Sequence, residues 1–401
     1  MSDPINFIES WIEGLLLAWG LTDGLVTVIL HVISVSVIAT LCMGTVTILI
    51  WYERKLAARL QDRIGPNRAG PFGLFQPVAD VIKLFTKETI TPDGVDKIAF
   101  NIAPIISVAS VLLIWAVIPF AATVVGTDIN VGVLYIAAMG SFGILAILMA
   151  GWSSNNKFAL LGAFRAVAQL ISYEVPMFMA LLIPVLLART MGINGIVEAQ
   201  STWFIFVAPV AAFIFFISSM AEVGRAPFDL LEAESEIVAG YNIEYSGMKF
   251  GMFYVSEFLH QFTVGALMTT LFLGGWRGPG AEQWPILGMT YAIAKIMVVY
   301  TVITWVRLTV PRIRIDQMLS FNWKFLTPLS LVTLIVTAVL DKTLDVAGAS
   351  RWIYVLSMLA ANLILVWGTA WVVKRVARPV ERTEFEPRPL AVPPNEHLHL
   401  R

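Results

Sequence analysis

The chain has 401 residues, of which 58% are hydrophobic and 14% are charged, and its formal net charge is −1 at pH 7. Soluble domains carry about 25% charged residues, so this composition excludes an ordinary soluble protein. A net charge so close to zero also argues against a nucleic-acid partner.

The chain begins with MSDPINFIESWIEGLLLAWG, which has neither a positively charged start nor a small-residue cleavage site. We therefore expect a short interfacial helix here and no cleaved signal peptide. Beyond it, apolar runs of roughly 20 residues, the length that crosses a bilayer, recur along the chain. They predict transmembrane helices at 24–52, 100–122, 132–152, 158–188, 203–223, 248–273, 286–308, 325–341 and 352–373. The predicted fold class is an all-α integral membrane protein with about nine transmembrane helices plus amphipathic helices on the cytoplasmic side.

Composition divides the chain into three parts. We expect residues 1–23 to form an N-terminal periplasmic or interfacial segment, 24–374 a polytopic membrane domain, and 375–401 a cytoplasmic tail. The tail is polar and rich in proline, which is typical of an extended or disordered arm.

The positive charges are distributed unequally between the two sides of the predicted helices. Of the 27 Lys and Arg residues, the loops on one side hold only Arg189, Arg277, Lys342 and Arg351. Because positive loops stay in the cytoplasm, the N-terminus is predicted to be periplasmic and the C-terminus cytoplasmic. The long segments 53–99, 223–247 and 308–324 then share the cytoplasmic side, which we expect to be the working face.

The first of these segments contains a turn and a candidate surface helix. RIGPNRAGPFG, residues 63–73, is rich in glycine and proline and predicts a tight, stiff turn. GLFQPVADVIKLFTKE, residues 73–88, predicts an amphipathic helix on the membrane surface or under a partner. Its apolar stripe holds Phe75, Val78, Ile82 and Phe85, and its charged stripe holds Asp80, Lys83 and Lys87.

The most unusual segment is RAPFDLLEAESEIVAGYNIEY, residues 225–245, which lies between two long apolar runs. Its carboxylates are Asp229, Glu232, Glu234, Glu236 and Glu244, and Arg225 is the only cation among them. Spacings of four, three and four residues would place Arg225, Asp229, Glu232 and Glu236 on one face of a helix. Like charges this close cannot all ionise at low cost, a property that suits a proton relay. A solvated acidic loop is the alternative interpretation.

Several ionisable residues also lie within the predicted membrane helices. Each costs roughly 2.5–3.5 kcal/mol on insertion scales if it has no partner. They are Arg165 and Glu174 in the fourth helix, Glu222 at the end of the fifth, Glu257 in the sixth and Lys295 in the seventh. Arg165 and Glu174 are nine residues apart and should therefore face opposite ways. These residues either form a functional polar path or pair to lock helices together.

Motifs for cofactors are lacking. Cys42 is the single cysteine and cannot hold an iron–sulfur cluster, and the four histidines offer no metal or haem pair. His31 and His260 are interpreted as polar residues turned into the helix bundle. There is no glycine-rich nucleotide-binding string. We therefore expect no cofactor bound covalently or by a motif, and no metal.

Four blocks of the chain are similar to one known family. They are ERKLAARLQDRIGPNRAGPFGLFQPVADVIKLFTKE (53–88), GAFRAVAQLISYEVP (162–176), EVGRAPFDLLEAESEIVAGYNIEYSGMKFGMFYVSE (222–257) and WVRLTVPRIRIDQMLSFNWK (305–324). In this order they resemble the H subunit of bacterial respiratory complex I, NADH-quinone oxidoreductase, the counterpart of mitochondrial NADH dehydrogenase subunit 1. The resemblance covers about residues 24–341, and a ninth membrane helix is like the bacterial members.

The resemblance implies a membrane subunit of a proton-pumping enzyme in the bacterial cytoplasmic (inner) membrane. Such a subunit forms part of a quinone chamber with two hydrophilic subunits and starts the proton-coupling path into the membrane arm. It is not catalytic alone. Quinone is the substrate, while NADH, FMN and the iron–sulfur clusters belong to partner subunits. Neighbouring small membrane subunits and the lipid bilayer are the other expected partners.

The resemblance, together with the physical needs of an apolar quinone tunnel, assigns candidate site residues. The quinone-chamber residues are Glu53, Arg54, Arg63, Phe228, Phe253, Tyr254 and Arg307. The proton-path residues are Arg165, Glu174, Arg225, Asp229, Glu232, Glu234, Glu236 and Glu257. Arg59 stands where mitochondrial relatives often have tyrosine, so it is assigned no contact with the quinone headgroup.

Two alternatives remain open at this point. One is the equivalent membrane subunit of a related hydrogenase or of a ferredoxin- or F420-dependent complex. The other is an independent ion transporter, which would predict discontinuous helices and paired repeats. The sequence gives no sign of either feature.

Overall fold

The structure, a computed structural model, describes residues 4–230 and 238–376. This part of the chain is helical and contains no strand. The long helices are α1 (Pro4–Ala18), α2 (Asp23–Leu60), α3 (Gln76–Thr86), α4 (Lys97–Ile114), α5 (Gly132–Ser153), α6 (Lys157–Ala188), α9 (Pro209–Val223), α11 (Gly247–Phe272), α12 (Pro285–Thr309), α14 (Thr327–Val346) and α15 (Arg351–Val376). The shorter elements are η1 (Pro71–Gly73), η2 (Trp115–Val117), α7 (Ile193–Ala199), α8 (Phe204–Val207), η3 (Gly240–Asn242), α13 (Ile315–Phe321) and the π-turn η4 (Asn322–Leu326).

Seven helices in the described residues are long and apolar enough to cross a membrane. They are α2, α4 with η2, α5, α6, α12, α13 to α14 taken together, and α15. The fifth and sixth expected spans correspond to the shorter apolar helix α9 and to α11, which contains Glu257 and His260. The prediction of an all-α membrane protein is confirmed. The first span is longer than expected, because α2 continues beyond residue 52 to Leu60.

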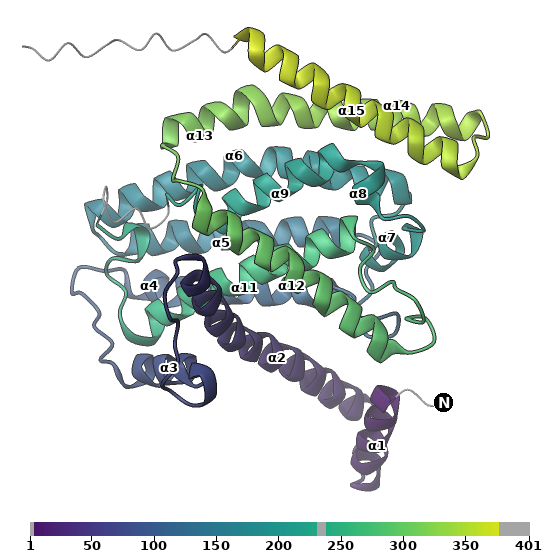
Figure 1. Ribbon diagram of the computed structural model, residues 1–401. Coiled ribbons are helices and arrows are strands. Elements are labelled where there is room, and N and C mark those ends of the chain that lie inside the picture. The colour runs from purple at the N-terminus through teal and green to yellow at the C-terminus, as the bar shows by residue number, and fades with distance from the viewer. Residues whose placement is uncertain (1–3, 231–237, 377–401) are drawn as a thin grey trace, which may run out of the picture.

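The helices form a central bundle with additions on two sides (Figure 1). α5 packs against α4 and α6, α6 against α9, and α11 against α4 and α12. α14 and α15 pack together on one side of the bundle, and α2 leaves it on another side toward α1. Helices α2, α5, α9 and α12 end on the same side of the bundle, which we call the loop face. Helices α6 and α14 end on the other side, which we call the opposite face.

Small residues allow a close approach where the loop face meets α6. Gly162 lies against Gly240 of η3, and a Cβ built on Gly162 would be 2.7 Å from the Gly240 Cα. Ala159, Ala163 and Ala166 of the same helix are fully buried. Small residues at helix contacts are what close packing within a bilayer requires. They hold the chain after the acidic segment directly on α6.

The fifth span is broken, contrary to the expectation of no discontinuous helix. α8 ends at Val207, and Ala208 has φ −133° and ψ 63° before α9 begins at Pro209. Proline disfavours helical conformation in the residue before it and has no N–H to donate. Asn362 of α15 bridges the break: its Nδ2 donates to the Val207 carbonyl at 3.1 Å, and its Oδ1 accepts from the Val210 N–H at 3.4 Å.

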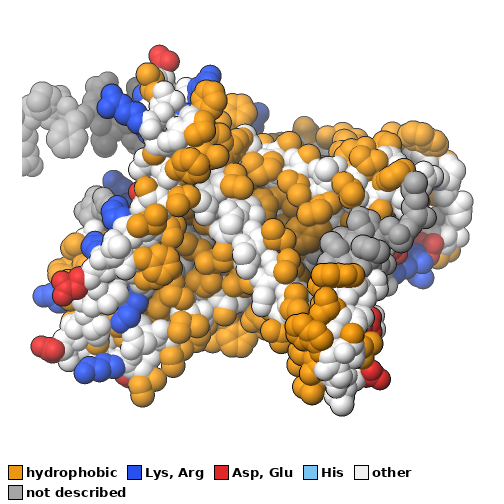
Figure 2. All heavy atoms as spheres, turned by 90° about the horizontal axis from the view of Figure 1, so that it is seen from below, with side chains coloured by type: hydrophobic (Ala, Val, Ile, Leu, Met, Phe, Trp, Pro, Cys, Tyr) orange, Lys and Arg blue, Asp and Glu red, His pale blue; other side chains and the backbone are white. Residues whose placement is uncertain are grey.

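Apolar side chains cover most of the surface between the two faces. In Figure 2 the hydrophobic side chains form a broad area, while Lys, Arg, Asp and Glu gather toward its ends. Three of the valines and leucines of α2, Val28, Val35 and Leu41, are more than half exposed. Such exposure suits hydrocarbon or partner helices rather than water.

The surface helix expected at 73–88 is present as α3. Val78, Ile82 and Phe85 form an exposed apolar stripe. On another side of the helix, Asp80 accepts from Arg54 of α2 at 2.6 Å. The prediction of an amphipathic helix is confirmed, and the ion pair ties it to the end of α2.

Candidate functional site

Glu53, Tyr300 and Arg307 join α2 to α12 near the loop face. Tyr300 and Arg307 are seven residues apart, about two turns, so they share one face of α12. The Tyr300 hydroxyl donates to Glu53 Oε2 at 3.1 Å, and the Arg307 guanidinium pairs with Glu53 Oε1. Glu53 is buried, so its carboxylate depends on the guanidinium for charge compensation and on the hydroxyl for a further hydrogen bond.

Arg225 and Glu257 form a second buried ion pair. Gly224, with φ +71°, ends α9 in the left-handed region and turns the chain so that Arg225 enters the bundle. Arg225 Nε lies 2.9 Å from Glu257 Oε1, and the Arg225 side chain is only 5% exposed. The guanidinium also lies over the rings of Phe258, at 4.8 Å, and Tyr254, at 5.9 Å. A cation this deeply buried is tolerated only because it is paired.

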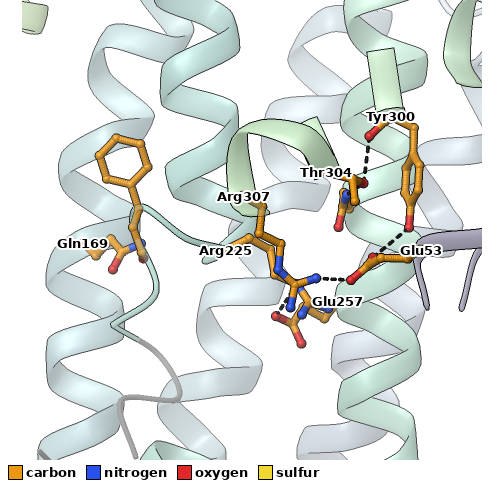
Figure 3. A network of polar contacts seen from close by, with 9 residues as sticks. Glu53, Gln169, Arg225, Glu257, Tyr300, Thr304 and Arg307 are labelled. Atoms are coloured by element: carbon orange, nitrogen blue, oxygen red, sulfur yellow. Dashed lines mark hydrogen bonds and ion pairs between the residues drawn. The ribbon is translucent and has the colours of Figure 1, made fainter. Parts of the chain in front are cut away.

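The two ion pairs belong to one cluster. The charges of Glu53, Arg225, Glu257 and Arg307 all act electrostatically on the Tyr254 hydroxyl. Figure 3 shows the two guanidinium groups between the two carboxylates. The formal charge of the cluster is zero. Charges interact strongly in such a poorly hydrated space, so a new charge nearby would disturb the pairing of all four.

The turn that carries Arg225 is held rigidly by α6. Gln169 Nε2 donates to the carbonyls of Ala221, at 2.7 Å, and Phe228, at 2.8 Å. The Phe228 ring lies 5.3 Å from that of Tyr173. The third loop is attached to the same turn, because the Ile313 N–H donates to the Pro227 carbonyl at 3.0 Å.

The expectation of one helical face from Arg225 to Glu236 is wrong for its first part. Residues 225–230 form turns and irregular chain, because Gly224 ends the helix and Pro227 follows at once. Asp229 is half-buried in this stretch. Glu232, Glu234 and Glu236 lie outside the described residues.

Deeper in the bundle, Glu222, His260 and Glu174 bring polar atoms from three helices together. Glu222 Oε1 on α9 lies 3.9 Å from His260 Nε2 on α11. Glu174 on α6 accepts from the Ser141 hydroxyl of α5 at 3.3 Å. Glu257 and His260 are three residues apart on α11 and so lie on one side of it. This spacing links the deeper group to the ion pair with Arg225.

Two cavities connect these carboxylates. One, of about 70 Å³, is lined by Glu222, Glu257 and His260 together with the serine hydroxyls of positions 107, 110 and 256. The other, of about 20 Å³, is lined by Glu174, Glu222 and His260. A cavity needs roughly 10–15 Å³ to hold a water molecule, so both are large enough for one. The two cavities share Glu222 and His260, which places polar groups between Glu257 and Glu174.

Comparison with known proteins identifies the family. The family model for NADH dehydrogenase matches residues 33–338, which is more than half of the chain. The chain belongs to the NADH dehydrogenase family.

Curated relatives in this family are named as the H subunit of NADH-quinone oxidoreductase. The one from Dehalococcoides mccartyi strain CBDB1 is 52% identical over 294 residues, covering 73% of this chain and 82% of the relative. The one from Carboxydothermus hydrogenoformans is 48% identical, covering 76% and 86%. The one from Brevibacillus brevis is 43% identical, covering 80% and 94%. The resemblance to the H subunit inferred from the sequence is confirmed.

For this family member, the structure brings together part of the predicted chamber set. Glu53 and Arg307 belong to the four-charge cluster, and Tyr254 lies beside it. Phe253 lines the larger cavity, with its ring 5.0 Å from that of Tyr245. Phe228 is buried against Tyr173.

Arg54 and Arg63 lie farther out on the loop face. Arg54 pairs with Asp80 of α3. Arg63 is exposed, and its Nε donates to Gln61 Oε1 at 2.8 Å. Neither residue belongs to the four-charge cluster, and Arg54 faces α3 through Asp80.

Of the predicted proton-path residues, Arg225, Glu257 and Glu174 take part in the cluster or the cavities. Arg165 is half-buried on α6 and lines neither cavity, as expected for a residue facing away from Glu174. Glu222 and His260 were given no place in the path by sequence reasoning. The spacing in the sequence nevertheless indicates both residues, because Glu222 lies in the last turn before Arg225 and His260 lies one turn from Glu257.

Lys295 forms hydrogen bonds to the backbone that stabilise the fold. Its ammonium group donates to the carbonyls of Leu273, Gly275 and Arg277, each at 2.9 Å. These carbonyls follow the end of α11, where no helical N–H reaches them. Lys295 therefore fixes the chain after α11 and lies apart from the two cavities.

Within the residues that the structure describes, no group of three or more His, Cys, Asp or Glu side chains could hold a metal ion. Cys42 is a free thiol buried in α2.

Proposed function

We propose that this chain is a membrane subunit of a proton-pumping NADH:quinone oxidoreductase, in which it forms part of the quinone chamber and starts the proton-coupling path. The observation that carries the proposal is the continuous series of buried charges and cavities from the loop face into the bundle. The names of the relatives support a quinone-linked complex over a hydrogenase-like one.

The quinone-chamber part of the proposal concerns the loop face. A quinone headgroup is apolar apart from two carbonyl oxygens, so it needs an apolar wall and a few donors. Tyr254, Phe253 and Phe228 supply aromatic surface, and Glu53, Arg54, Arg63 and Arg307 supply polar groups around it. The electrons come from partner subunits that hold NADH, FMN and the iron–sulfur clusters, and quinone is the substrate.

The coupling part follows from the four-charge cluster. Reduction of the quinone by two electrons creates negative charge, which must be neutralised by two protons. A negative charge beside the cluster attracts Arg225 and Arg307 away from Glu257 and Glu53. A carboxylate that loses its cation gains affinity for a proton. That proton can then pass through Glu222 and His260 to Glu174. The acidic residues Asp229, Glu232, Glu234 and Glu236 supply protons, and Arg165 adjusts the field near α6.

The surroundings of the protein complete the proposal. Hydrophilic quinone-site subunits cover the loop face, and small membrane subunits and lipid cover the apolar sides. The membrane is the bacterial cytoplasmic (inner) membrane, with the N-terminus periplasmic and the C-terminus cytoplasmic. Residues 1–23 are the periplasmic or interfacial segment, 24–374 the membrane domain and 375–401 the cytoplasmic tail.

Replacing Glu222 tests the path most directly. Glutamine keeps the size of Glu222 but cannot carry a proton, so Glu222→Gln should allow assembly and lower quinone-dependent NADH oxidation at least tenfold. Intact complexes in vesicles are assayed for NADH oxidation and for protons moved per NADH. Glu198→Gln, on α7 at the opposite face, is the matched control. Wild-type turnover and proton ratio in Glu222→Gln would remove Glu222 from the path.

A further inference from the structure

A cavity of about 420 Å³ opens at the opposite face, away from the proposed proton path. Its walls come from the end of α6, the chain between α7 and α8, the end of α14 and the start of α15. The volume lies in the range of roughly 300–1,000 Å³ that is usual for small-molecule sites. Because membrane helices begin and end around it, the cavity lies at the depth of the lipid headgroups.

One part of the cavity is negatively charged. Arg189 Nη2 lies 2.9 Å from Asp345 Oδ2 and 4.0 Å from Asp341 Oδ2. The Tyr354 hydroxyl donates to Asp341 Oδ1 at 2.7 Å. Two carboxylates thus share a single guanidinium group, which leaves a formal charge of −1. Asp341 is mostly buried, with a side chain 17% exposed, so this charge is concentrated inside the cavity.

Another part of the cavity is positively charged. Arg351 Nη2 donates to the Thr202 hydroxyl at 2.8 Å. Across the described chain, no carboxylate lies within ion-pair distance of Arg351, so none of these residues compensates its charge of +1. Guanidinium groups bind phosphate through paired, charge-assisted hydrogen bonds, which makes Arg351 a suitable partner for a phosphodiester.

The remaining lining is apolar and includes Leu187, Phe204, Val207, Leu344 and Val355. A ligand that matches the whole cavity therefore needs a cation, an anion and an apolar portion. We propose that the cavity binds the headgroup of a zwitterionic phospholipid of the phosphatidylethanolamine type, with its phosphate on Arg351 and Thr202 and its ammonium group on Asp341 and Asp345.

Charge decides between this lipid and an anionic one. Phosphatidylglycerol would satisfy Arg351 but would bring no cation for the two carboxylates. The ethanolamine lipid satisfies both parts of the cavity at once. The inference depends only on the membrane location of the helices, so it stands or falls separately from the quinone role.

The test uses the intact complex reconstituted in vesicles that contain photoactivatable phosphatidylethanolamine or photoactivatable phosphatidylglycerol. Cross-links to residues 199–207 and 341–355 are counted by mass spectrometry. In the wild type, phosphatidylethanolamine should label these peptides more than phosphatidylglycerol does. Arg351→Gln should lower labelling by both lipids about tenfold, the loss expected for one charge-assisted contact. Arg277→Gln, an arginine at the same face that does not line the cavity, should leave labelling unchanged.

A second variant checks the charge argument. Asp341→Asn makes the cavity positive, so it should weaken labelling by phosphatidylethanolamine and strengthen labelling by phosphatidylglycerol. If Arg351→Gln fails to assemble on native gels, Thr202→Val removes the hydroxyl beside Arg351 and should lower phosphatidylethanolamine labelling several-fold. Equal labelling by the two lipids in the wild type would overturn the proposal. Loss of all labelling at a soluble glycerophosphoethanolamine concentration far below that of the vesicle lipid would also overturn it, because the site would then prefer a free zwitterion to the lipid.

Discussion

Glu53 and Arg307 are 254 residues apart in sequence, yet they form a direct ion pair that fastens α2 to α12. The Tyr52 hydroxyl, 2.7 Å from that of Thr301, ties the same end of α2 to α12, whereas most side chains of the preceding part of α2 are exposed. The pair therefore fixes the position of the loop-face end of α2, and with it α3, which Arg54 holds through Asp80. A change in the charge of Glu53 would act on both helices.

Arg307→Gln should reduce quinone-dependent NADH oxidation because Glu53 loses its cation. Removing one partner of a buried pair costs about 3–5 kcal/mol, reduced here because the Arg307 side chain is one quarter exposed. We expect at least a tenfold loss of turnover in assembled complex. Lys97→Gln, an exposed cation at the same face, is the control. Unchanged turnover in Arg307→Gln would show that the pair has no part in quinone chemistry.

Tyr254→Ala should weaken quinone reduction without harming electron entry from NADH. Tyr254 lies over Arg225 and its ring is 5.0 Å from that of Phe258, so it forms a wall of the four-charge cluster. The rate with quinone should fall, while the rate with a hydrophilic artificial electron acceptor should persist. Tyr135→Ala, at the opposite end of the bundle, serves for comparison. An equal fall of both rates in assembled Tyr254→Ala complex would contradict a chamber role.

A double change of Lys83 and Lys87 to Glu should lower the amount of intact complex. Lys83 lies on α3 and Lys87 directly follows its last residue, and both are exposed, so they can bind acidic groups of a hydrophilic subunit. Native gels of solubilised membranes measure the intact complex. The change of both lysines to Gln is the milder companion and should have an intermediate effect. Wild-type amounts with both glutamates would exclude α3 as an assembly contact.

Lys295→Met should destabilise the protein but leave the activity of each assembled complex near normal. The variant leaves three carbonyls after α11 without a donor, at a cost of about 3 kcal/mol or more. Thermal inactivation should occur at a lower temperature, and turnover per complex should be retained. Lys295→Arg, which can still donate to several carbonyls, should recover part of the stability. A loss of turnover in fully assembled, thermally stable complex would assign Lys295 to the proton path instead.

Sequence reasoning recovered the fold class because apolar runs of membrane length are a strong and local signal. It also located α3, since the stripe of Val78, Ile82 and Phe85 follows the helical period. It missed the extension of α2, because the charged run after residue 52 resembles a loop although its residues favour helix. It missed the break at Ala208 as well, because a single proline within an apolar run is compatible with a continuous helix.

The site was only partly predictable for a related reason. Arg225 and Glu257 stand out as rare charges in an apolar chain, but their pairing depends on the turn at Gly224 and on the packing of α9 against α11. Glu222 and His260 come from different helices, and their shared cavity exists only once α5, α9 and α11 are in contact. Spacing along one helix cannot reveal a route that crosses several.

The bridge from Asn362 to the break in the fifth span has a consequence for the order of events during synthesis. The Val210 N–H finds its partner on a residue 152 positions later in the chain. Ribosomes add about 5–20 residues per second, so on the order of ten seconds separate the emergence of the break from that of the side chain that bridges it. During that interval the Val207 carbonyl and the Val210 N–H must be satisfied by water or by the insertion machinery, since lipid offers them no partner. The last helix thus supplies the side chain that bridges the break in a span made much earlier. In a nascent chain that stops before Arg351, the fifth span lacks this bridge.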